Sequence, residues 1–382
     1  MNISKFVAPE IIFGRGSLSQ LGESAVRIGA SKVFLVSDEG VIKAGWVDQA
    51  VHYLHAAGLE TEIFSSLTTN PKDFEVIEGV IRYKEARCDG IVAVGGGSPT
   101  DVAKAIAILV ANGGTLQDYE GINKITTPLP PMVIAPSTAG AGSEVSQFAI
   151  IVDTVRKLKM SIISKSLVPD IAIVDPELVR TMDAKLAAAT GLDAFTHGIE
   201  SYVSLAATTL TDIHALKAIQ LSSQNLRRAV ADRRDMEANT NMSMASLTAG
   251  LAFSNAILGA THAMTHQVDG LIDQHHGETN ASILPHVMEF NLQACPDRFR
   301  DIAIAMGEDV TGLDINAAAV RSIVAVKQLI ADIGLAKGLA DIGLKEEFIP
   351  LLSQNAMKDA CIVTNPRSAS QKEIEAIYRK AM

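Results

Sequence analysis

The stretch AVGGGSPTDVAK (Ala93–Lys104) marks the place where an apolar strand ends, a run of glycines turns the chain, and a helix begins. Three consecutive glycines permit a tight turn and a close approach of the backbone to a ligand. Free N–H groups at the start of the following helix favour a phosphate. The pattern differs from the GxGxxG dinucleotide fingerprint, so a tight turn without any ligand remains the alternative. The stretch predicts a strand–loop–helix unit of an α/β fold.

Further strand candidates lie on both sides of this unit, up to about residue 180. They are almost continuously apolar, as expected for parallel strands that are buried on both faces. Helical segments such as LSQLGESAVRIG and PKDFEVIEGVIRYKEA separate several of them. The alternation predicts an α/β domain with a parallel sheet. The strand candidates are Lys32–Asp38, Thr61–Leu67, Gly90–Ser98, Pro131–Thr138 and Ile171–Leu178.

From about residue 182 onward the strand signals disappear. Segments such as TDIHALKAIQLSSQNLRRAVA and INAAAVRSIVAVKQLIADIG have a helical period and an Ala- and Leu-rich composition. We therefore expect two domains, an α/β domain over residues 1–181 and a helical domain over residues 182–382. The segment DPELVRTMDAK, near residues 175–185, is the candidate hinge, and an interface between domains is a common place for a small-molecule site.

Composition narrows the function classes further. The 382 residues contain 33 lysines and arginines against 43 aspartates and glutamates, and a net charge of −10 argues against a nucleic-acid partner. No charge-free apolar run is long enough for a transmembrane helix, and the N-terminus does not resemble a signal peptide. An odd number of cysteines without a CxxC pair favours a reducing compartment, the cytoplasm. These cysteines are Cys88, Cys295 and Cys361.

A second candidate loop for a nucleotide is PSTAGAGSE (Pro136–Glu144), in which a strand leads into small and hydroxyl residues. Two such loops at the same end of a parallel sheet would form a crevice for a nucleotide. Asp38 follows the strand KVFLVS, where a carboxylate could accept the ribose 2′-hydroxyl and repel a 2′-phosphate. A helix cap or turn residue is the alternative for Asp38.

Four of the nine histidines fall in THAMTHQVDGLIDQHHG (Thr261–Gly277). His262 and His266 are spaced i,i+4 and share a helix face, but a metal needs further ligands. The segment TGLDAFTHGIESY offers another i,i+4 pair, Asp193 and His197, within an apolar helix where polar side chains are costly unless satisfied. Together with His262 and His276, this pair would give three imidazoles and one carboxylate, a set that suits a first-row divalent metal. Surface or core histidines are the alternative.

The joint pattern of GGGSPTDVAK, STAGAGSE, GLDAFTHGIESY, THAMTHQVDGLIDQHHG and NPR (Asn365–Arg367) resembles the iron-containing, group III alcohol dehydrogenase family. Within that family the chain is most similar to the short-chain alcohol, methanol and 1,3-propanediol dehydrogenases. The resemblance implies an NAD-binding α/β domain at residues 1–181. It also implies an all-helical metal- and substrate-binding domain at residues 182–382, on a plan shared with dehydroquinate synthase.

The resemblance also implies roles for individual residues. The metal ligands fall on Asp193, His197, His262 and His276, with Fe²⁺ as the usual ion and Zn²⁺ or another divalent metal as the alternative. His266 falls near substrate and nicotinamide, where it could relay a proton. Phe253 and Cys361 fall on the alcohol pocket, although Cys361 could equally be a small buried residue. The cofactor contacts fall on Asp38, Asn70, Gly95, Gly96, Gly97, Ser98, Asp101, Thr138, Ser143 and Lys159.

Several residues depart from the usual family pattern, among them His275, Glu278, Asp183 and Asp269. Asp183 is expected to cap the first helix of the second domain. Asp269 lies three residues after His266, and our hypothesis is that it orients an imidazole; a solvated acid on a helix face is the alternative. His214 and His286 are expected to be structural.

These patterns predict an NAD-dependent enzyme that interconverts a small primary alcohol and its aldehyde, with the metal as Lewis acid. A homodimer or larger homo-oligomer without nucleic-acid or membrane partners is expected. One alternative is a glycerol dehydrogenase-like or dehydroquinate synthase-like activity on the same fold, but the Asp193/His197 pair argues against it. The other alternative is a scaffold protein with an inactive site, and the complete set of four ligands argues against that.

Overall fold

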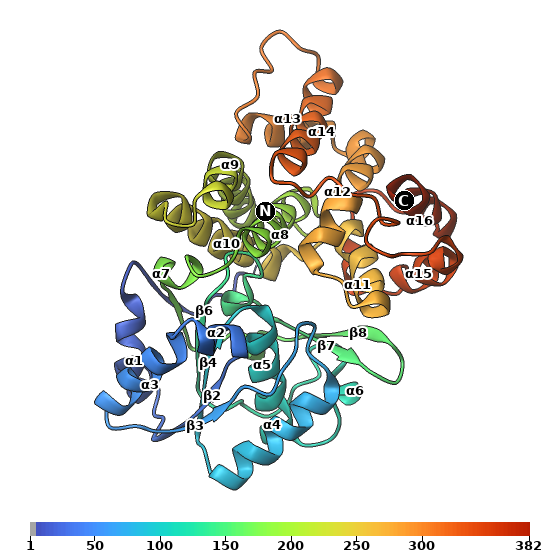
Figure 1. Cartoon of the computed structure of the whole chain (residues 1–382). Coiled ribbons are helices and arrows are strands. Elements are labelled where there is room, and N and C mark those ends of the chain that lie inside the picture. The colour runs from blue at the N-terminus through green and yellow to red at the C-terminus, as the bar shows by residue number, and fades with distance from the viewer. Residues whose placement is uncertain (1–4) are drawn as a thin grey trace. The chain divides into compact units, whose positions relative to one another are not determined.

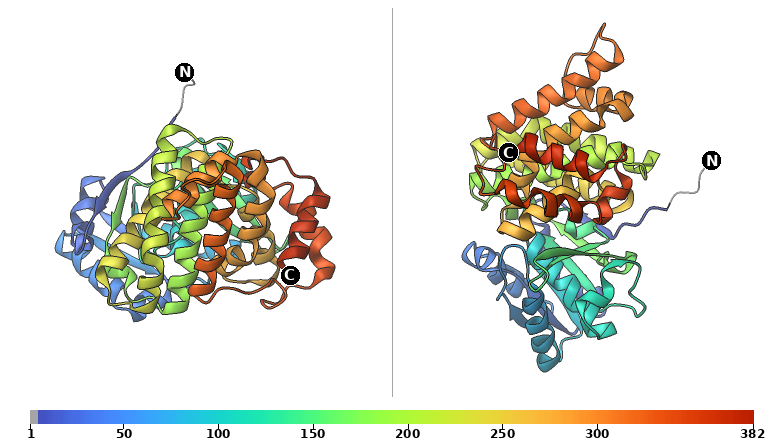
Figure 2. Two further views of the ribbon diagram at one scale, coloured as in Figure 1. Left: turned by 90° about the horizontal axis from the view of Figure 1, so that it is seen from above. Right: turned by 90° about the vertical axis from the view of Figure 1, so that its right-hand side faces the viewer.

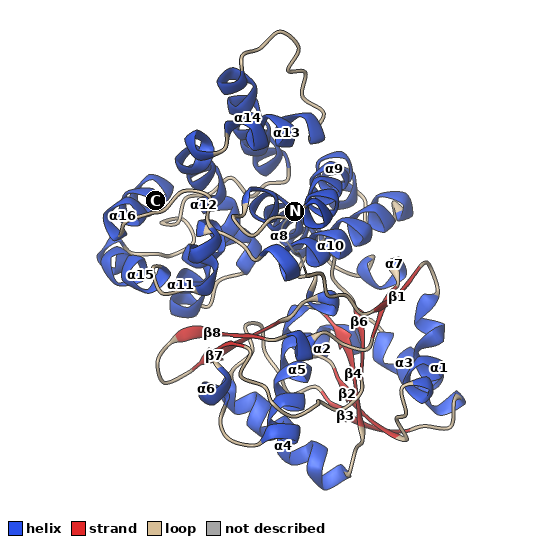
Figure 3. Cartoon of the chain, turned by 180° about the vertical axis from the view of Figure 1, so that it is seen from behind, coloured by secondary structure: helices blue, strands red, loops and turns tan. Residues whose placement is uncertain are grey.

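The computed structural model describes residues 5–382, which separate into two compact units. One unit runs from Val7 to Thr181. The other consists of Met182–Met382 with the described residues that precede Val7. Figure 3 shows the strands gathered in the first unit, whereas the second is built from helices. The predicted fold class, a parallel α/β part followed by a helical part, is confirmed.

The first unit is organised around a six-stranded parallel sheet in the order β1-β9-β6-β4-β2-β3. The strands are β1 (Glu10–Phe13), β2 (Lys32–Val36), β3 (Glu60–Phe64), β4 (Gly90–Gly95), β6 (Met132–Pro136) and β9 (Ile171–Val174). The helices are α1 (Leu21–Arg27), α2 (Glu39–Lys43), α3 (Trp46–Ala56), α4 (Asp73–Ala86), α5 (Gly97–Asn112), α6 (Leu116–Tyr119) and α7 (Pro176–Val179).

Apolar side chains fill both faces of this sheet. Phe34 and Val36 of β2 belong to a core that includes residues of α4 and α5. Val33 and Leu35 point to the opposite face and pack in a core with residues of α1 and α3. Because alternate residues of a strand face opposite sides, a run such as KVFLV must be apolar throughout. This explains the continuous apolar runs of β2, β4, β6 and β9, whereas the edge strand β3 is only partly buried.

The sequence did not single out four of the strands, which are β1 at one edge of the main sheet and the three strands of a second sheet. β7 (Phe148–Asp153) and β8 (Leu158–Ile163) form an antiparallel hairpin, which β5 (Gly121–Ile122) joins as a parallel edge. β7 alternates buried and half-buried residues in part, so its pattern is weaker than that of the doubly covered strands. This hairpin carries Lys159 and follows directly on the second glycine-rich loop.

The second unit contains long helices around α8 (Ala184–Val203). This helix packs against α9 (Thr209–Ala231), α10 (Met236–Ala256) and α12 (His276–Asn291). Figures 1 and 2 show these helices from three sides. A further core forms between α11, α12, α15 and α16, where Met264, Ile283 and Tyr378 are fully buried. The remaining helices are α11 (Ala260–Ile272), α13 (Pro296–Ala305), α14 (Ile315–Asp332), α15 (Ile349–Ala356) and α16 (Gln371–Ala381).

The caps at the start of this unit follow the sequence. Asp183 accepts a hydrogen bond from the Leu186 amide (2.7 Å) and caps α8, as predicted.

Across residues 5–382, no single helix is long and apolar enough to span a membrane. The pair α10 and α11 reaches that length only together, across a bend of 102°.

Candidate metal centre and dinucleotide loops

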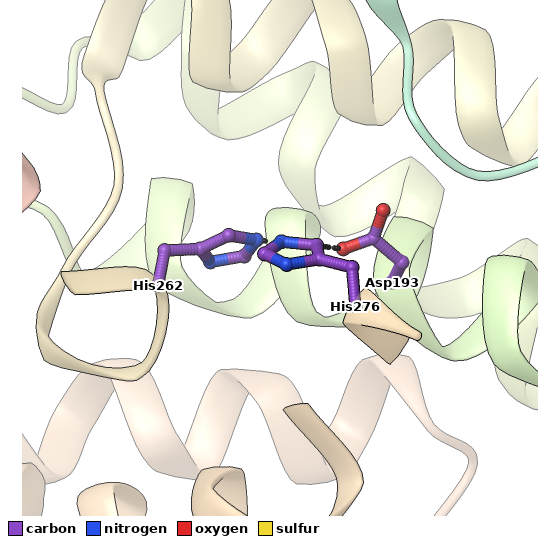
Figure 4. Close-up of side chains that lie close together, drawn as sticks. All are labelled: Asp193, His262 and His276. Atoms are coloured by element: carbon purple, nitrogen blue, oxygen red, sulfur yellow. Dashed lines mark ion pairs between the residues drawn. The ribbon is translucent and has the colours of Figure 1, made fainter. Parts of the chain in front are cut away.

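Four side chains from three helices meet inside the helical unit. The Nε2 atoms of His197, His262 and His276 lie 3.5, 3.4 and 3.7 Å from a single atom, Oδ1 of Asp193. Figure 4 shows the His262 and His276 rings beside this carboxylate. Ligand atoms of Asp193, His262 and His276 lie within 4.8 Å of one another, although up to 83 positions separate these residues in the chain, and His197 adjoins the group through Asp193.

Helix geometry and one glycine bring these side chains together. Asp193 and His197 lie one turn apart on α8, on the same face. Gly277, at the start of α12, lies so close to α8 that a Cβ atom would stand 1.9 Å from the backbone oxygen of Ala189. Only glycine permits this approach, and it brings the neighbouring His276 up to the α8 carboxylate.

The donor set fits a divalent ion. Two ligand atoms bound about 2.1 Å from a tetrahedrally coordinated ion lie roughly 3.4 Å apart, close to the observed separations. Nε2 of His262 is buried, and no hydrogen-bond partner for it exists within residues 5–382. An unsatisfied buried nitrogen is costly, and an ion at this point would remove the cost. Three imidazoles and one carboxylate suit Fe²⁺ or Zn²⁺.

A second layer of polar groups holds these ligands in place. Glu200 Oε2 lies 2.7 Å from Nδ1 of His262, and Asp269 Oδ2 lies 2.5 Å from Nδ1 of His276. Asn280 donates to Oδ1 of Asp193 (2.8 Å). Carboxylates bound to Nδ1 fix the ring orientation and the tautomer, which would leave Nε2 available to a metal ion.

Glu200 has a further structural task at the start of α11. Its carboxylate accepts hydrogen bonds from the backbone N–H groups of Gly259 (3.1 Å), Thr261 (2.6 Å) and His262 (3.3 Å). The N-cap residue Gly259 provides no side chain for this purpose. Glu200 therefore caps α11 and orients one of its histidines at the same time.

The hypothesis for Asp269 is confirmed in its geometry. This residue is 1% exposed, so the alternative of a solvated acid is wrong. Its second oxygen accepts a hydrogen bond from the Thr279 hydroxyl (2.7 Å). Both carboxylate oxygens of Asp269 therefore point into α12, which carries His276.

Burial and opposite charges shift the pKa values of this cluster in different directions. Burial raises the pKa of Asp193, but the three histidines around it outweigh burial and hold that pKa well below its usual range. Burial lowers the pKa of His197 to about 3. Burial also opposes a charge on His262, but Asp193 and Glu200 together raise its pKa to about 9. Asp193 is therefore a charged carboxylate at neutral pH.

His266 lies beside this cluster. Its ring is stacked on that of His276 with centroids 5.5 Å apart, and its Nδ1 lies 2.9 Å from Oδ2 of Asp359. His266 is therefore anchored through Nδ1 by a buried carboxylate, and an imidazole held in this way keeps Nε2 available.

The two residues predicted for the alcohol pocket also border the histidines. Phe253 is 5% exposed, and its ring centroid lies 4.4 Å from that of His197. Cys361 is buried, and its sulfur lies within 4.8 Å of ligand atoms of His266 and Asp359. Burial raises the pKa of this thiol well above its usual value, so Cys361 is a neutral lining group.

Structural explanations apply to the other unusual polar residues. Glu278 is buried and pairs with Nζ of Lys185 at 2.8 Å. His275 is the N-cap residue of α12 without a side-chain cap hydrogen bond, and only His276, the second member of the HH doublet, belongs to the candidate metal cluster. His214 stacks on the ring of Phe6 with centroids 5.5 Å apart.

In the other unit, the two glycine-rich loops lie side by side. Gly95 at the end of β4 is paired with Pro136 at the end of β6, so both loops leave the same edge of the sheet. A Cβ atom on Gly96 would stand 3.0 Å from Thr138, and one on Gly97 would stand 3.2 Å from Ala141. The glycines therefore allow the loops to touch, as expected for a nucleotide crevice at a sheet edge.

The remaining residues predicted for the cofactor lie around these loops. Ser98 is in the first turn of α5, and Ser143 begins the turn that closes the second loop. Asp38 caps α2 by accepting from the Val41 amide (3.0 Å), so the cap anticipated as its alternative role is present. Asn70 is buried with φ 53°, a conformation that asparagine tolerates. Burial raises the pKa of Asp101 to about 6, and the charge of Lys159 on β8 opposes this shift in part.

Comparison with known proteins identifies the family. The model described as iron-containing alcohol dehydrogenase matches residues 8–176, and the one described as the C-terminal part of the Fe-containing alcohol dehydrogenase family matches residues 187–382. The chain belongs to the iron-containing alcohol dehydrogenase family. The chain is 44% identical to the 1,3-propanediol dehydrogenase of Klebsiella pneumoniae over 379 residues, 98% of each chain.

Two further relatives agree with this assignment. The NAD-dependent methanol dehydrogenase of Bacillus methanolicus is 42% identical over 377 residues, 99% of each chain. The crystal structure of a 1,3-propanediol oxidoreductase superimposes with a TM-score of 0.97 and 43% identity over the whole of both chains. The family predicted from sequence is confirmed, as is the prediction that the chain is an alcohol dehydrogenase. The glycerol dehydrogenase-like or dehydroquinate synthase-like alternative is not favoured.

Sequence reasoning overlooked three residues that bind side chains of this cluster, namely Glu200, Asn280 and Asp359. Glu200 could have been found, because Asp193, His197 and Glu200 are spaced i, i+4 and i+7 on one helix face. Asp359 offered no comparable signal. It lies 93 positions from His266, in a segment whose sequence pattern indicates only a helix.

Proposed function

We propose that this chain oxidises a small primary alcohol to its aldehyde with NAD⁺, and catalyses the reverse reduction with NADH. The alcohol loses a hydride from its carbinol carbon to the nicotinamide and a proton from its hydroxyl to solvent, so the reaction is balanced as aldehyde, NADH and H⁺. The observation that carries the proposal is the convergence of three imidazole nitrogens on one carboxylate oxygen within a buried site. The name of the Bacillus methanolicus relative, NAD-dependent methanol dehydrogenase, supports the cofactor.

Asp193, His197, His262 and His276 would hold the metal. When bound, the ion supplies a Lewis acid that lowers the pKa of the alcohol and polarises the carbonyl in the reverse direction. The chain keeps the four donors aimed at one point through Glu200, Asp269 and Asn280, which bind the ligand side chains from behind. Because these contacts already hold the four side chains in place, a metal ion could bind without the entropic cost of ordering them.

His266 would carry the proton between the substrate and solvent. Its position against the His276 ring and its hydrogen bond to Asp359 support this role. Phe253 and Cys361 would form apolar walls of the alcohol pocket, because both are buried beside the histidines. An apolar lining favours a small alkyl chain over a sugar or a polyol.

The two glycine-rich loops would bind the dinucleotide through Gly95, Gly96, Gly97, Ser98, Thr138 and Ser143. The free N–H groups at the start of α5 suit the pyrophosphate. Asp38 and Asn70 would lie on the adenine-ribose side, where the Asp38 carboxylate would repel the 2′-phosphate of NADP. Asp101 and Lys159 complete the proposed set.

A cytoplasmic homodimer or larger homo-oligomer without a nucleic-acid or membrane partner is part of the same proposal. The net charge of −10 supports the absence of a nucleic-acid partner. The three cysteines are all unpaired, which is consistent with a reducing compartment.

A substrate panel tests the function. The chain would be loaded with Fe²⁺, Zn²⁺ or Mg²⁺ and assayed at 340 nm, with NAD⁺ and short alcohols or diols, and with NADH and the matching aldehydes. We expect NADH formation with small primary alcohols and Fe²⁺, and little response to NADP⁺. The proposal would be refuted by activity on glycerol alone, or by a lack of activity on every alcohol and aldehyde whichever metal is added.

His266→Ala should lower kcat by roughly 10²-fold while metal content stays the same.

A further inference from the structure

Lys104 is the most deeply buried charged side chain near the two glycine-rich loops. It lies about two turns into α5, the helix that starts at the first loop, and it has no exposed area. Its Nζ lies 2.7, 2.8 and 3.0 Å from the backbone oxygens of Ser143, Ser146 and Phe148, and 3.1 Å from Oγ of Ser146. One ammonium therefore holds the segment that closes the second loop and begins β7.

Asp101, one turn before Lys104 on α5, holds the same segment at a further point. Its Oδ2 accepts from the backbone amide of Ile150 at 3.3 Å. The Ser143 hydroxyl also interacts with the Asp101 carboxyl group by hydrogen bonding. A single helix thus carries the first loop at its N-terminus and clamps the second loop by two side chains.

The two glycine-rich loops are in close contact with each other. Gly96 faces Thr138, and Gly97 faces Ala141 at distances that leave no room for a Cβ atom without movement. A small displacement of the segment after Gly142 would therefore separate the two loops or drive them together. A crevice that grips a dinucleotide from both sides depends on this separation.

Stability alone gives a weak reason for this lysine. Burial lowers the pKa of Lys104 and raises those of Asp101 and Glu144, which shows that each charge is held against a desolvation cost. Buried charges of this kind often add little stability compared with apolar residues of similar size. Their directional hydrogen bonds instead specify one arrangement of the backbone.

We propose that Lys104 is a positioning residue for the dinucleotide, because it fixes the second glycine-rich loop at a set distance from the first. This inference rests on the proposed NAD-dependent function. It assigns a role in cofactor affinity to a side chain that is inaccessible to the cofactor itself. The lysine acts through Ser143, which is proposed to contact the dinucleotide.

The test compares Lys104→Met and Lys104→Gln with the wild-type chain and with Ile108→Ala. Ile108 lies one turn beyond Lys104, is equally buried, and has a side chain that forms no hydrogen bonds. We expect the dissociation constant for NADH, measured by nucleotide fluorescence, to rise about tenfold or more in the Lys104 variants as preorganisation is lost. Metal content per chain should stay the same, and backbone amides of Ser143–Ile150 should exchange hydrogen faster in the absence of cofactor. The Ile108→Ala chain should melt earlier but bind NADH as the wild type does.

Equal NADH affinity in folded Lys104 variants, or an equal loss in Ile108→Ala, would overturn the positioning role and leave the proposed function intact. A wild-type chain that binds no NADH would overturn the proposed function and this role with it. If both Lys104 variants fail to fold, Ser146→Ala removes one acceptor of the ammonium and gives a milder test. Faster exchange of the loop amides with a weaker NADH affinity supports the proposal, and an unchanged affinity contradicts it.

Discussion

The two candidate sites differ in the groups that form them, which are mainly backbone groups in one and side chains in the other. In the unit of residues 7–181, the loops after β4 and β6 offer backbone N–H groups and hydroxyls, and glycines let the loops touch. In the helical unit, four side chains from α8, α11 and α12 aim at one point, and carboxylates support two of them from behind. The first site is a matter of backbone shape, whereas the second depends on the chemical identity of its side chains.

This difference predicts different responses to substitution. A metal site loses a ligand with each substitution, because no neighbouring group can replace an imidazole nitrogen at the same point. A backbone site tolerates the loss of a side chain but not the addition of one, since added atoms displace the loop. Removing atoms should therefore damage the helical unit's site, and adding atoms should damage the loops.

The largest effect is expected at the ligands. His262→Ala should abolish metal binding and lower kcat/KM by roughly a thousandfold or more, because transition-state stabilisation by the ion is lost. Metal content would be measured by elemental analysis beside the alcohol assay. The matched control is His275→Ala, which removes the neighbouring imidazole of the HH doublet and should keep both metal and activity. Full activity of a metal-free His262→Ala chain would remove the metal from the mechanism.

A smaller effect is expected from the carboxylates behind the ligands. Glu200→Gln leaves the ligands in place but weakens the hydrogen bonds to His262 and to the start of α11, so metal affinity should fall about 10- to 100-fold. Asp269→Asn should act in the same direction through His276. Chelator competition gives the affinity without an activity assay. Glu289→Gln, on an exposed ion pair of the same unit, is the control, and an affinity loss as large there would show a nonspecific effect.

The smallest effect is expected from a graded enlargement of the first loop. Gly97 has no positive φ, so a side chain there acts by its bulk alone. Gly97→Ala brings a methyl group to 3.2 Å from Ala141 and should weaken NADH binding a few-fold, about 1 kcal/mol or less. Gly97→Val should weaken it further, and metal content should be unchanged in both. Normal NADH affinity in the valine variant would show that loop contact does not shape the cofactor site.

Much of the architecture follows from local pattern. Strands covered on both faces must be apolar throughout, so KVFLV and its counterparts could be read directly, as could the helical period after residue 182. The β7–β8 hairpin could not be read in the same way, because its strands are only partly covered and their pattern is diluted. The i,i+4 spacing of Asp193 and His197 indicates by itself that the two side chains form a pair on one helix face.

By itself, the sequence determined the order of the two parts, the helix faces, and the residue types able to hold a metal or a phosphate, because these depend on spacing along the chain. Only the tertiary structure decided which distant groups meet. It brought Asp359 to His266, set Asp269 behind His276, and enclosed Lys104 among the carbonyls of the second loop. Such contacts depend on how helices and loops pack across tens of residues, and no periodicity along the chain records that packing.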